Sequence, residues 1–221
     1  MLYLIATPIG NLADFSYRAI SVIQSCDYLL CEDTRRSRIL LNHYALDKPL
    51  RSYHRFNEEK KKADILEDLR NGKTVGLLSD AGTPSIADPG LRLVMACREQ
   101  KLPVIPIPGS CAAIVALVGS GLDTERFQFV GFLPKKRGEL KKLLADALLY
   151  PGTTICYESP FRLKEALKVL EALDPERRVV IARELTKKFE EFIEGTPVFL
   201  RERWKEKPPK GEIVILISRK I

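Results

Sequence analysis

The sequence predicts an α/β protein of two domains, a parallel-centred sheet followed by a mixed sheet, on three observations. Short apolar segments alternate with amphipathic helical stretches through most of the chain, which is typical of parallel strands joined by helices. Residues 127–132 and 190–195 instead alternate apolar and polar side chains, as half-exposed antiparallel strands do. A chain of 221 residues that is 45% hydrophobic can form two packed cores.

Four segments of the first half have the continuous hydrophobicity of strands that are buried on both faces. They are residues 3–6, 28–31, 74–78 and 104–107. Residues 58–70 have the apolar periodicity of an amphipathic helix, and Pro89 can open a further helix through Gln100. Because strands and helices alternate, we expect the sheets to be parallel at their centres.

The second half is expected to form the mixed sheet. Besides the two period-two segments, it contains three continuous apolar strands and one amphipathic helix: residues 153–157, 179–182 and 212–217, and residues 160–173. An alanine-rich helix over residues 111–120 and the short connection after it mark a domain boundary. The expected domains are residues 1–119 and residues 120–221.

Composition excludes several classes of protein. Residues 1–9 are apolar but lack a basic flank and end at Gly10, so they predict neither a signal peptide nor a membrane helix, and we expect a cytoplasmic protein. Five cysteines without a Cys-x-x-Cys pair, and only two histidines, predict buried thiols and no metal site. No Gly-x-Gly-x-x-Gly occurs, and Glu67 replaces the first glycine of a P-loop, so neither NAD nor ATP is indicated.

The charge favours polyanionic partners. Lys and Arg total 36 against 29 Asp and Glu, a net charge of +7. Two of the basic clusters comprise Arg35, Arg36 and Arg38, and Lys135, Lys136 and Arg137. Each alone also fits an ordinary solvated surface. Residues 53–57 interleave aromatic and basic side chains, which suits either stacking on unpaired bases or a strand end whose aromatics lie in the core.

Three loops at strand ends are rich in glycine and proline: residues 7–11, 79–90 and 108–110. Glycine lets the backbone approach a ligand, and proline holds a loop in one shape. For any single loop, ordinary turn chemistry explains these residues equally well. Three such loops at the carboxyl ends of strands predict a site for a small polar cofactor held largely by main-chain groups.

Nine motifs in register resemble those of the ribosomal RNA small-subunit methyltransferase I family. They are ATPIGNL (6–12), CEDTR (31–35), SYHRFNE (52–58), SDAGTP (79–84), PIPG (106–109), GFLP (131–134), YESP (157–160), ARELTK (182–187) and GEIV (211–214). The resemblance implies a tetrapyrrole-methylase-like fold of two α/β domains with S-adenosylmethionine in the cleft between them. It further implies methylation of a cytidine ribose 2′-hydroxyl in small-subunit ribosomal RNA, free or in the assembled subunit, by a homodimer.

The resemblance also implies which residues bind the cofactor. They are Thr7, Pro8, Ile9, Gly10, Asp80, Ala81, Gly82, Ser85, Pro108, Gly109, Ser110 and Tyr157. Asp80 and loop carbonyls suit the sulfonium and ammonium charges, whereas the N–H groups near Gly109 and Ser110 suit the carboxylate.

A ribose hydroxyl is a weak acid, so we expect a general base, or a cation that stabilises the developing alkoxide. The candidates in the matching motifs are Asp33, Glu158, Arg183, Glu184 and Lys187. Each also fits an ordinary ion pair, and Lys187 can act as a base only if burial lowers its pKa. The six cations of the two basic clusters are the expected phosphate contacts. Alternative functions are a tetrapyrrole methylase, a non-catalytic RNA-binding protein and, more distantly, an α/β oxidoreductase.

Overall fold

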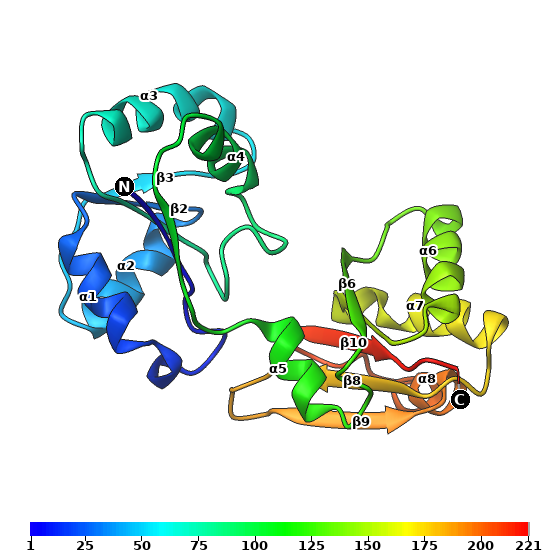
Figure 1. Cartoon of the computed structure of the whole chain (residues 1–221). Coiled ribbons are helices and arrows are strands. Elements are labelled where there is room, and N and C mark those ends of the chain that lie inside the picture. Colours follow the sequence, from blue (N-terminus) through cyan, green and yellow to red (C-terminus); the bar gives the residue numbers. More distant parts are fainter. Residues whose placement is uncertain (221) are drawn as a thin grey trace. The chain divides into compact units, whose positions relative to one another are not determined.

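The computed structural model describes residues 1–220, which form two compact units that divide between Cys111 and Ala112. Each unit contains one five-stranded sheet (Figure 1). The division falls before α5 (Ala112–Gly119), earlier than the boundary expected after residue 119. The helix belongs to the second unit because it packs against β7 (Thr153–Glu158) and β10 (Ile213–Ile217).

The first sheet is wholly parallel, which confirms the expected parallel centre, and its strand order is β3-β2-β4-β1-β5. Its strands are β1 (Leu2–Ile5), β2 (Tyr28–Cys31), β3 (Leu50–Ser52), β4 (Val75–Leu78) and β5 (Val104–Ile107). All five carboxyl ends therefore meet at one edge of the sheet. β3 was not expected, because its three residues are too short to show a periodicity.

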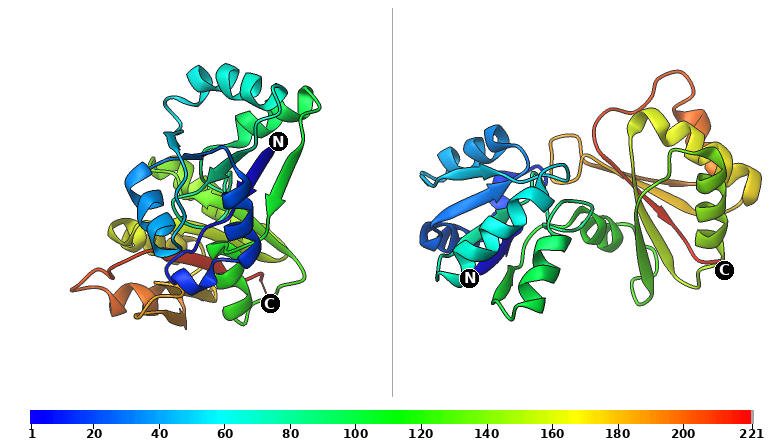
Figure 2. Two further views of the ribbon diagram at one scale, coloured as in Figure 1. Left: turned by 90° about the vertical axis from the view of Figure 1, so that its left-hand side faces the viewer. Right: turned by 90° about the horizontal axis from the view of Figure 1, so that it is seen from above.

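Helices cover both faces of this sheet (Figures 1 and 2). A short 3-10 helix, η1 (Leu12–Asp14), precedes them in the chain. The helices are α1 (Tyr17–Ser25) and α2 (Thr34–His43) on one face, and α3 (Glu58–Arg70) and α4 (Leu91–Glu99) on the other. Successive residues of β2 alternate between the two cores: Leu29 packs with α1 and α2, whereas Leu30 packs with α3 and α4. A strand that is buried on both faces needs the continuous apolar run seen in the sequence.

The second sheet is mixed, with strand order β6-β7-β10-β8-β9. Its other strands are β6 (Phe127–Phe132), β8 (Val179–Arg183) and β9 (Glu191–Gly195). β6 pairs with β7 in parallel, so the antiparallel expectation for this segment was wrong, because α6 (Arg137–Leu149) provides a crossover between the two strands. The remaining pairs are antiparallel, so the expected parallel centre was wrong for this sheet.

The two period-two segments are the edge strands of this sheet. β9 alternates half-buried and exposed residues as its sequence predicts, whereas β6 is exposed only at its two ends, Phe127 and Phe132. The core of the unit joins alternate residues of β10 to three helices, α6, α7 (Pro160–Leu173) and α8 (Pro197–Arg203). Figure 2 shows the same helices from two further directions. Within the described residues, no helix has both the length and the apolar composition needed to span a membrane.

Candidate functional site

Hydrogen bonds tie together the loops that follow β1, β4 and β5. The backbone of Thr7 pairs with that of Gly82 in both directions, at 2.9 and 3.0 Å. The Thr7 hydroxyl donates to the carbonyl of Ser79, and the Thr83 hydroxyl donates to the carbonyl of Ser110, each at 3.0 Å. The three glycine- and proline-rich loops therefore form one connected structure at the carboxyl edge of the first sheet.

Two glycines allow these loops to approach one another. A Cβ on Gly109 would lie 2.8 Å from the Cβ of Ala6, and a Cβ on Gly82 would lie 3.3 Å from Ile9. Gly82 also has a φ of +86°, which disfavours other residues. Among the expected cofactor residues, exposure is highest at Gly10, Ala81, Pro108 and Gly109. These four residues are the exposed part of the connected loops, where a ligand can reach them.

The loop after β4 has a strained backbone. Ser85 and Ala87 lie in the left-handed region, with φ of 70° and 63°. A Cβ on Gly90 would lie 2.6 Å from the Ser85 hydroxyl oxygen, which is buried without a hydrogen-bond partner among the residues described. The Ser79 hydroxyl donates to the carboxylate of Asp88. Such strain, about 1–3 kcal/mol per residue, is commonly found at ligand sites.

Asp80 and Asp33 connect this loop to the start of α2. Asp80 accepts a hydrogen bond from the Asp33 N–H at 3.1 Å, and it lies 3.9 Å from the Arg36 guanidinium. Asp33 is the N-cap of α2, where it accepts hydrogen bonds from the Arg35 side chain and N–H group. These bonds lower the pKa of Asp33 to about 2. Asp33 is thus a helix cap and a poor proton acceptor.

The other catalytic candidates lie at one edge of the second sheet. In the register of the strands, Ile213 of β10 is opposite both Glu158 of β7 and Arg183 of β8. Glu184 and Lys187 follow Arg183 directly in the chain. The structure thus brings these four charged residues to the same end of neighbouring strands, which we call the charged edge. Asp33 belongs to the first unit.

Lys187 is held between two carboxylates. Its ammonium donates to Glu184 at 2.9 Å and to Glu212 at 3.0 Å, and the Glu212 N–H donates to the same Glu184 oxygen at 3.0 Å. Partial burial alone would lower the pKa of Lys187 and raise that of Glu184. The hydrogen bonds outweigh burial, so the pKa of Lys187 is raised and that of Glu184 is lowered. The condition for Lys187 as a base is therefore not met. Glu212 was not expected at the site, although the GEIV motif contains it.

Glu158 has a different environment. Its side chain is 1% exposed; one oxygen accepts the Ser159 N–H at 2.7 Å, and the other lies 3.3 Å from the Arg162 guanidinium. Arg162 also donates to the carbonyl of Leu133 at 3.1 Å. Burial raises the pKa of Glu158, although the Ser159 N–H and Arg162 oppose this. Arg162 was missed in the sequence, where its four-residue spacing from Glu158 is the only signal.

Tyr157 points its hydroxyl at a helix start. The hydroxyl accepts the Ala113 N–H of α5 at 3.2 Å, and the ring makes edge contacts with Phe129 and Phe132. Its expected contact with the cofactor stays a prediction. In the first unit, Tyr53 is a core residue, whereas Phe56 is 98% exposed. The core interpretation thus fits Tyr53, and stacking of a base on Phe56 stays a prediction.

The six expected phosphate contacts are exposed or half-exposed cations. Five form ion pairs at the surface: Arg35 with Asp33, Arg36 with Asp80, Arg38 with Asp47, Lys136 with Glu139 and Arg137 with Glu165. Pairs of this kind contribute little to stability and can exchange for phosphate. Lys135 has no such partner in the described part of the chain. In residues 1–220, no group of three His, Cys, Asp or Glu side chains is arranged to hold a metal ion.

Comparison with known proteins gives strong sequence similarity. The family described as Tetrapyrrole (Corrin/Porphyrin) Methylases matches residues 1–197. The chain is 44% identical over 217 residues to "Ribosomal RNA small subunit methyltransferase I" of Halalkalibacterium halodurans, covering 98% of this chain and 75% of that protein. It is 45% identical over 222 residues to the protein of the same name from Hydrogenobaculum sp., covering 99% and 95%.

Solved structures share the fold at low sequence identity. A diphthine synthase has a TM-score of 0.76 at 15% identity, covering 99% of this chain and 90% of that one. A uroporphyrin-III C-methyltransferase from Thermus thermophilus, complexed with S-adenosyl homocysteine, has a TM-score of 0.65 at 18% identity, covering 97% and 96%. These likenesses confirm the two-domain α/β fold expected from the sequence.

Proposed function

The chain belongs to the ribosomal RNA small-subunit methyltransferase I family, and we propose that it methylates the ribose 2′-hydroxyl of a cytidine in small-subunit ribosomal RNA. The observation that carries this proposal is the identity of 44–45% with proteins of that name over almost the whole chain. The nine motifs lie on the loops at the carboxyl edge of the first sheet and at the charged edge of the second. A tetrapyrrole substrate is less consistent with these relatives.

S-adenosylmethionine is the methyl donor and supplies the transferred group. The residues present suit it: Gly109 is exposed, Asp80 is a carboxylate suited to a cationic ligand, and the Ser85 hydroxyl has no hydrogen-bond partner among the residues described. Asp80 would hold positive charge, and the N–H groups of Gly109 and Ser110 would bind a carboxylate. The connected loops would hold these groups in place without reorganisation.

We assign different roles to the charged residues at the edge of the second sheet. Lys187 is cationic and can stabilise negative charge that develops on the acceptor oxygen. Glu158, whose pKa is raised by burial, is better suited to accept the proton than Glu184 or Asp33. Arg183 pairs with Glu191 at 2.7 Å, and this ion pair supports the loop that carries Glu184 and Lys187.

The decisive experiment supplies labelled S-adenosylmethionine and small ribosomal subunits that lack the modification, and then maps the label in the RNA. Label on one cytidine ribose is expected. Incorporation into a base, or transfer only to a tetrapyrrole offered in parallel, would reject the assignment. Binding of RNA without transfer would favour the non-catalytic alternative. Protein-free RNA in a separate reaction shows whether the assembled subunit is required.

The quaternary state and the location of the protein belong to the same proposal. We propose a homodimer that acts in the cytoplasm, where ribosomal RNA is available. Light scattering of the purified chain should give twice its mass of 25.0 kDa, and a monomeric mass at micromolar concentration would contradict this.

A further inference from the structure

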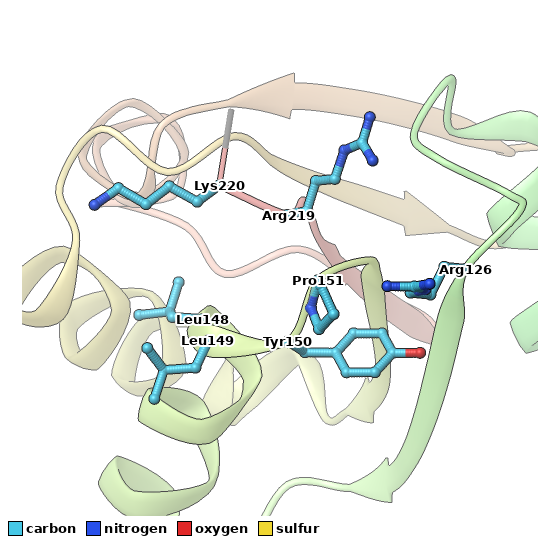
Figure 3. Close-up of a pocket in the computed structure, with 7 residues that line it drawn as sticks. All are labelled: Arg126, Leu148, Leu149, Tyr150, Pro151, Arg219 and Lys220. Carbon is cyan, nitrogen blue, oxygen red and sulfur yellow. The ribbon is translucent and has the colours of Figure 1, made fainter.

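A pocket of about 630 Å³ opens on the second unit where β7 begins (Figure 3). It is lined by Arg126, Leu148, Leu149, Tyr150, Pro151, Arg219 and Lys220. β7 runs from Thr153 beside this pocket to Glu158 at the charged edge. At about 3.3 Å per residue, these ends are roughly 17 Å apart. The pocket is therefore distinct from the candidate catalytic residues, although it belongs to the same unit.

The pocket is strongly basic. Of its lining residues within positions 1–220, three are cations and none is a carboxylate. Arg219 pairs at 3.1 Å with Asp123, which lies outside the lining. Arg126 makes no side-chain hydrogen bond or ion pair within residues 1–220, so its guanidinium is available. A free guanidinium beside further cations favours a phosphate group, which it can bind through two parallel hydrogen bonds.

The pocket also offers an aromatic surface. In Figure 3, the Tyr150 ring extends from the end of α6 toward Arg126, with Pro151 above it. Leu149, on the same wall, is 83% exposed. An aromatic ring next to a guanidinium that has no partner among the described residues is a combination with which proteins stack an unpaired base while contacting its phosphate.

The walls of the pocket are fixed by contacts beneath it. The Thr153 N–H donates to the carbonyl of Arg126 at 2.9 Å, and a Cβ on Gly152 would lie 2.2 Å from that oxygen. The buried Arg177 donates to the carbonyls of Leu148 and Ser218, at 3.2 and 3.0 Å. The end of α6 and the residue before Arg219 are thereby joined. A preformed surface lowers the entropic cost of binding.

We propose that this pocket binds one unpaired nucleotide of the substrate RNA, with its phosphate on Arg126 and Arg219 and its base on Tyr150. The proposal rests on the proposed function, because it takes RNA as the substrate. It adds a contact remote from the reacting ribose, which would contribute to affinity and to the selection of the target RNA segment.

The test compares Arg126→Gln and Tyr150→Ala with the wild-type chain. Lys168→Gln, which removes from α7 an exposed cation without an ion-pair partner among residues 1–220, is the control for charge, and Tyr150→Phe is the control that keeps the ring. Fluorescence anisotropy measures binding of a labelled single-stranded fragment of small-subunit RNA and of whole subunits at several salt concentrations. Thermal unfolding and calorimetry with S-adenosylmethionine verify that each variant is folded and binds the cofactor.

Arg126→Gln is expected to weaken binding of the RNA fragment about fivefold and to reduce the salt slope by about 0.7. Tyr150→Ala is expected to weaken it roughly tenfold, whereas both controls keep wild-type affinity. Unchanged affinity and slope in both variants would overturn the proposal. The proposal would also be overturned if the variants bound whole subunits more weakly but bound the RNA fragment normally, since the pocket would then contact a protein. The anisotropy measurement does not depend on catalysis. Absence of methyl transfer by the wild type would therefore reject the proposed function, while the RNA-binding results would still show whether the pocket binds a nucleotide.

Discussion

Gly211 and Glu184 make the tightest approach at the charged edge of the second sheet. Gly211 has a φ of +93°, and a Cβ there would lie 2.3 Å from the Glu184 carboxyl group. Glu184 itself has a positive φ of 52°, so its backbone is also constrained. The sequence predicted that Glu184 and Lys187 belong to the site but not how they pair, because Glu212 comes from a distant strand end.

Replacing Gly211 by alanine should therefore displace the Glu184 carboxylate. We expect Gly211→Ala to lower the free energy of unfolding by about 1–3 kcal/mol, because of the unfavourable φ and the clash, and to reduce methyl transfer. Urea unfolding measures the first effect. Gly138→Ala is the matched control: that position in α6 is open, so alanine should leave stability unchanged or raise it by up to about 1 kcal/mol. Equal behaviour of the two variants would contradict the argument.

Lys187 should act through its charge. We expect Lys187→Met to lower the methyl-transfer rate about 100-fold and Lys187→Arg to lower it much less, because arginine keeps the cation. A base would be lost equally in both variants, so equal rates would refute the cationic role. Single-turnover rates with small subunits provide the measurement.

The pH dependence of stability tests the same network. The pKa of Glu184 is below its ordinary value of 4.5, so its contribution is present above that value and is lost as the pH falls through the lowered pKa. The pKa of Lys187 is above 10.5, so its contribution is present below 10.5 and is lost as the pH rises through the raised pKa. Chemical unfolding of wild type and Lys187→Met should therefore differ by a constant amount from about pH 5 to 10. A difference that changes within this range would contradict the assigned charges.

At the scale of elements, the sequence was most informative where strands are buried on both faces. The parallel order of the first sheet followed from its continuous apolar runs, and the carboxyl-end loops then had to meet at one edge. Whether β6 is parallel or antiparallel to its partner was harder to predict. An alternation of apolar and polar residues indicates which side chains are exposed, but not the orientation of the partner strand. The domain boundary was displaced because α5 is apolar on most sides, so its sequence does not indicate which core it joins.

The loop after β4 gives the prediction at this scale. Asp80→Asn should weaken binding of S-adenosylmethionine about tenfold, since a charge-assisted contact is lost, with little change in stability. Asparagine can still accept the Asp33 N–H that Asp80 accepts now, so the start of α2 is retained. Isothermal titration calorimetry measures the affinity. Asp47→Asn, at a side chain that is 99% exposed, is the control for loss of one carboxylate. Wild-type affinity in Asp80→Asn would remove Asp80 from the cofactor site.

For the whole molecule, the net charge of +7 bears on association with RNA and not on the fold. The three apolar cores are separate from the basic clusters, which lie on loops and on the first two turns of helices. The sequence could identify these clusters, but it could not show that five of the six expected contacts already pair with carboxylates. Such pairs form between side chains at the folded surface, and a count of charges does not reveal them.

The salt dependence of RNA binding follows from these cations. Each phosphate contact with a single strand contributes roughly −0.7 to the slope of log affinity against log salt concentration. Six such contacts should therefore give a slope of about −4. Lys135, which has no partner within residues 1–220, should contribute fully, so Lys135→Gln should reduce the slope by about 0.7. Lys168→Gln, in α7 and outside both basic clusters, should leave it unchanged. The slope is measured by anisotropy titrations of a small-subunit RNA fragment at salt concentrations from about 50 to about 200 mM, the range over which such contacts weaken. Affinity that stays constant over this range would show that the basic clusters do not bind phosphates, because release of counterions is unavoidable when they do.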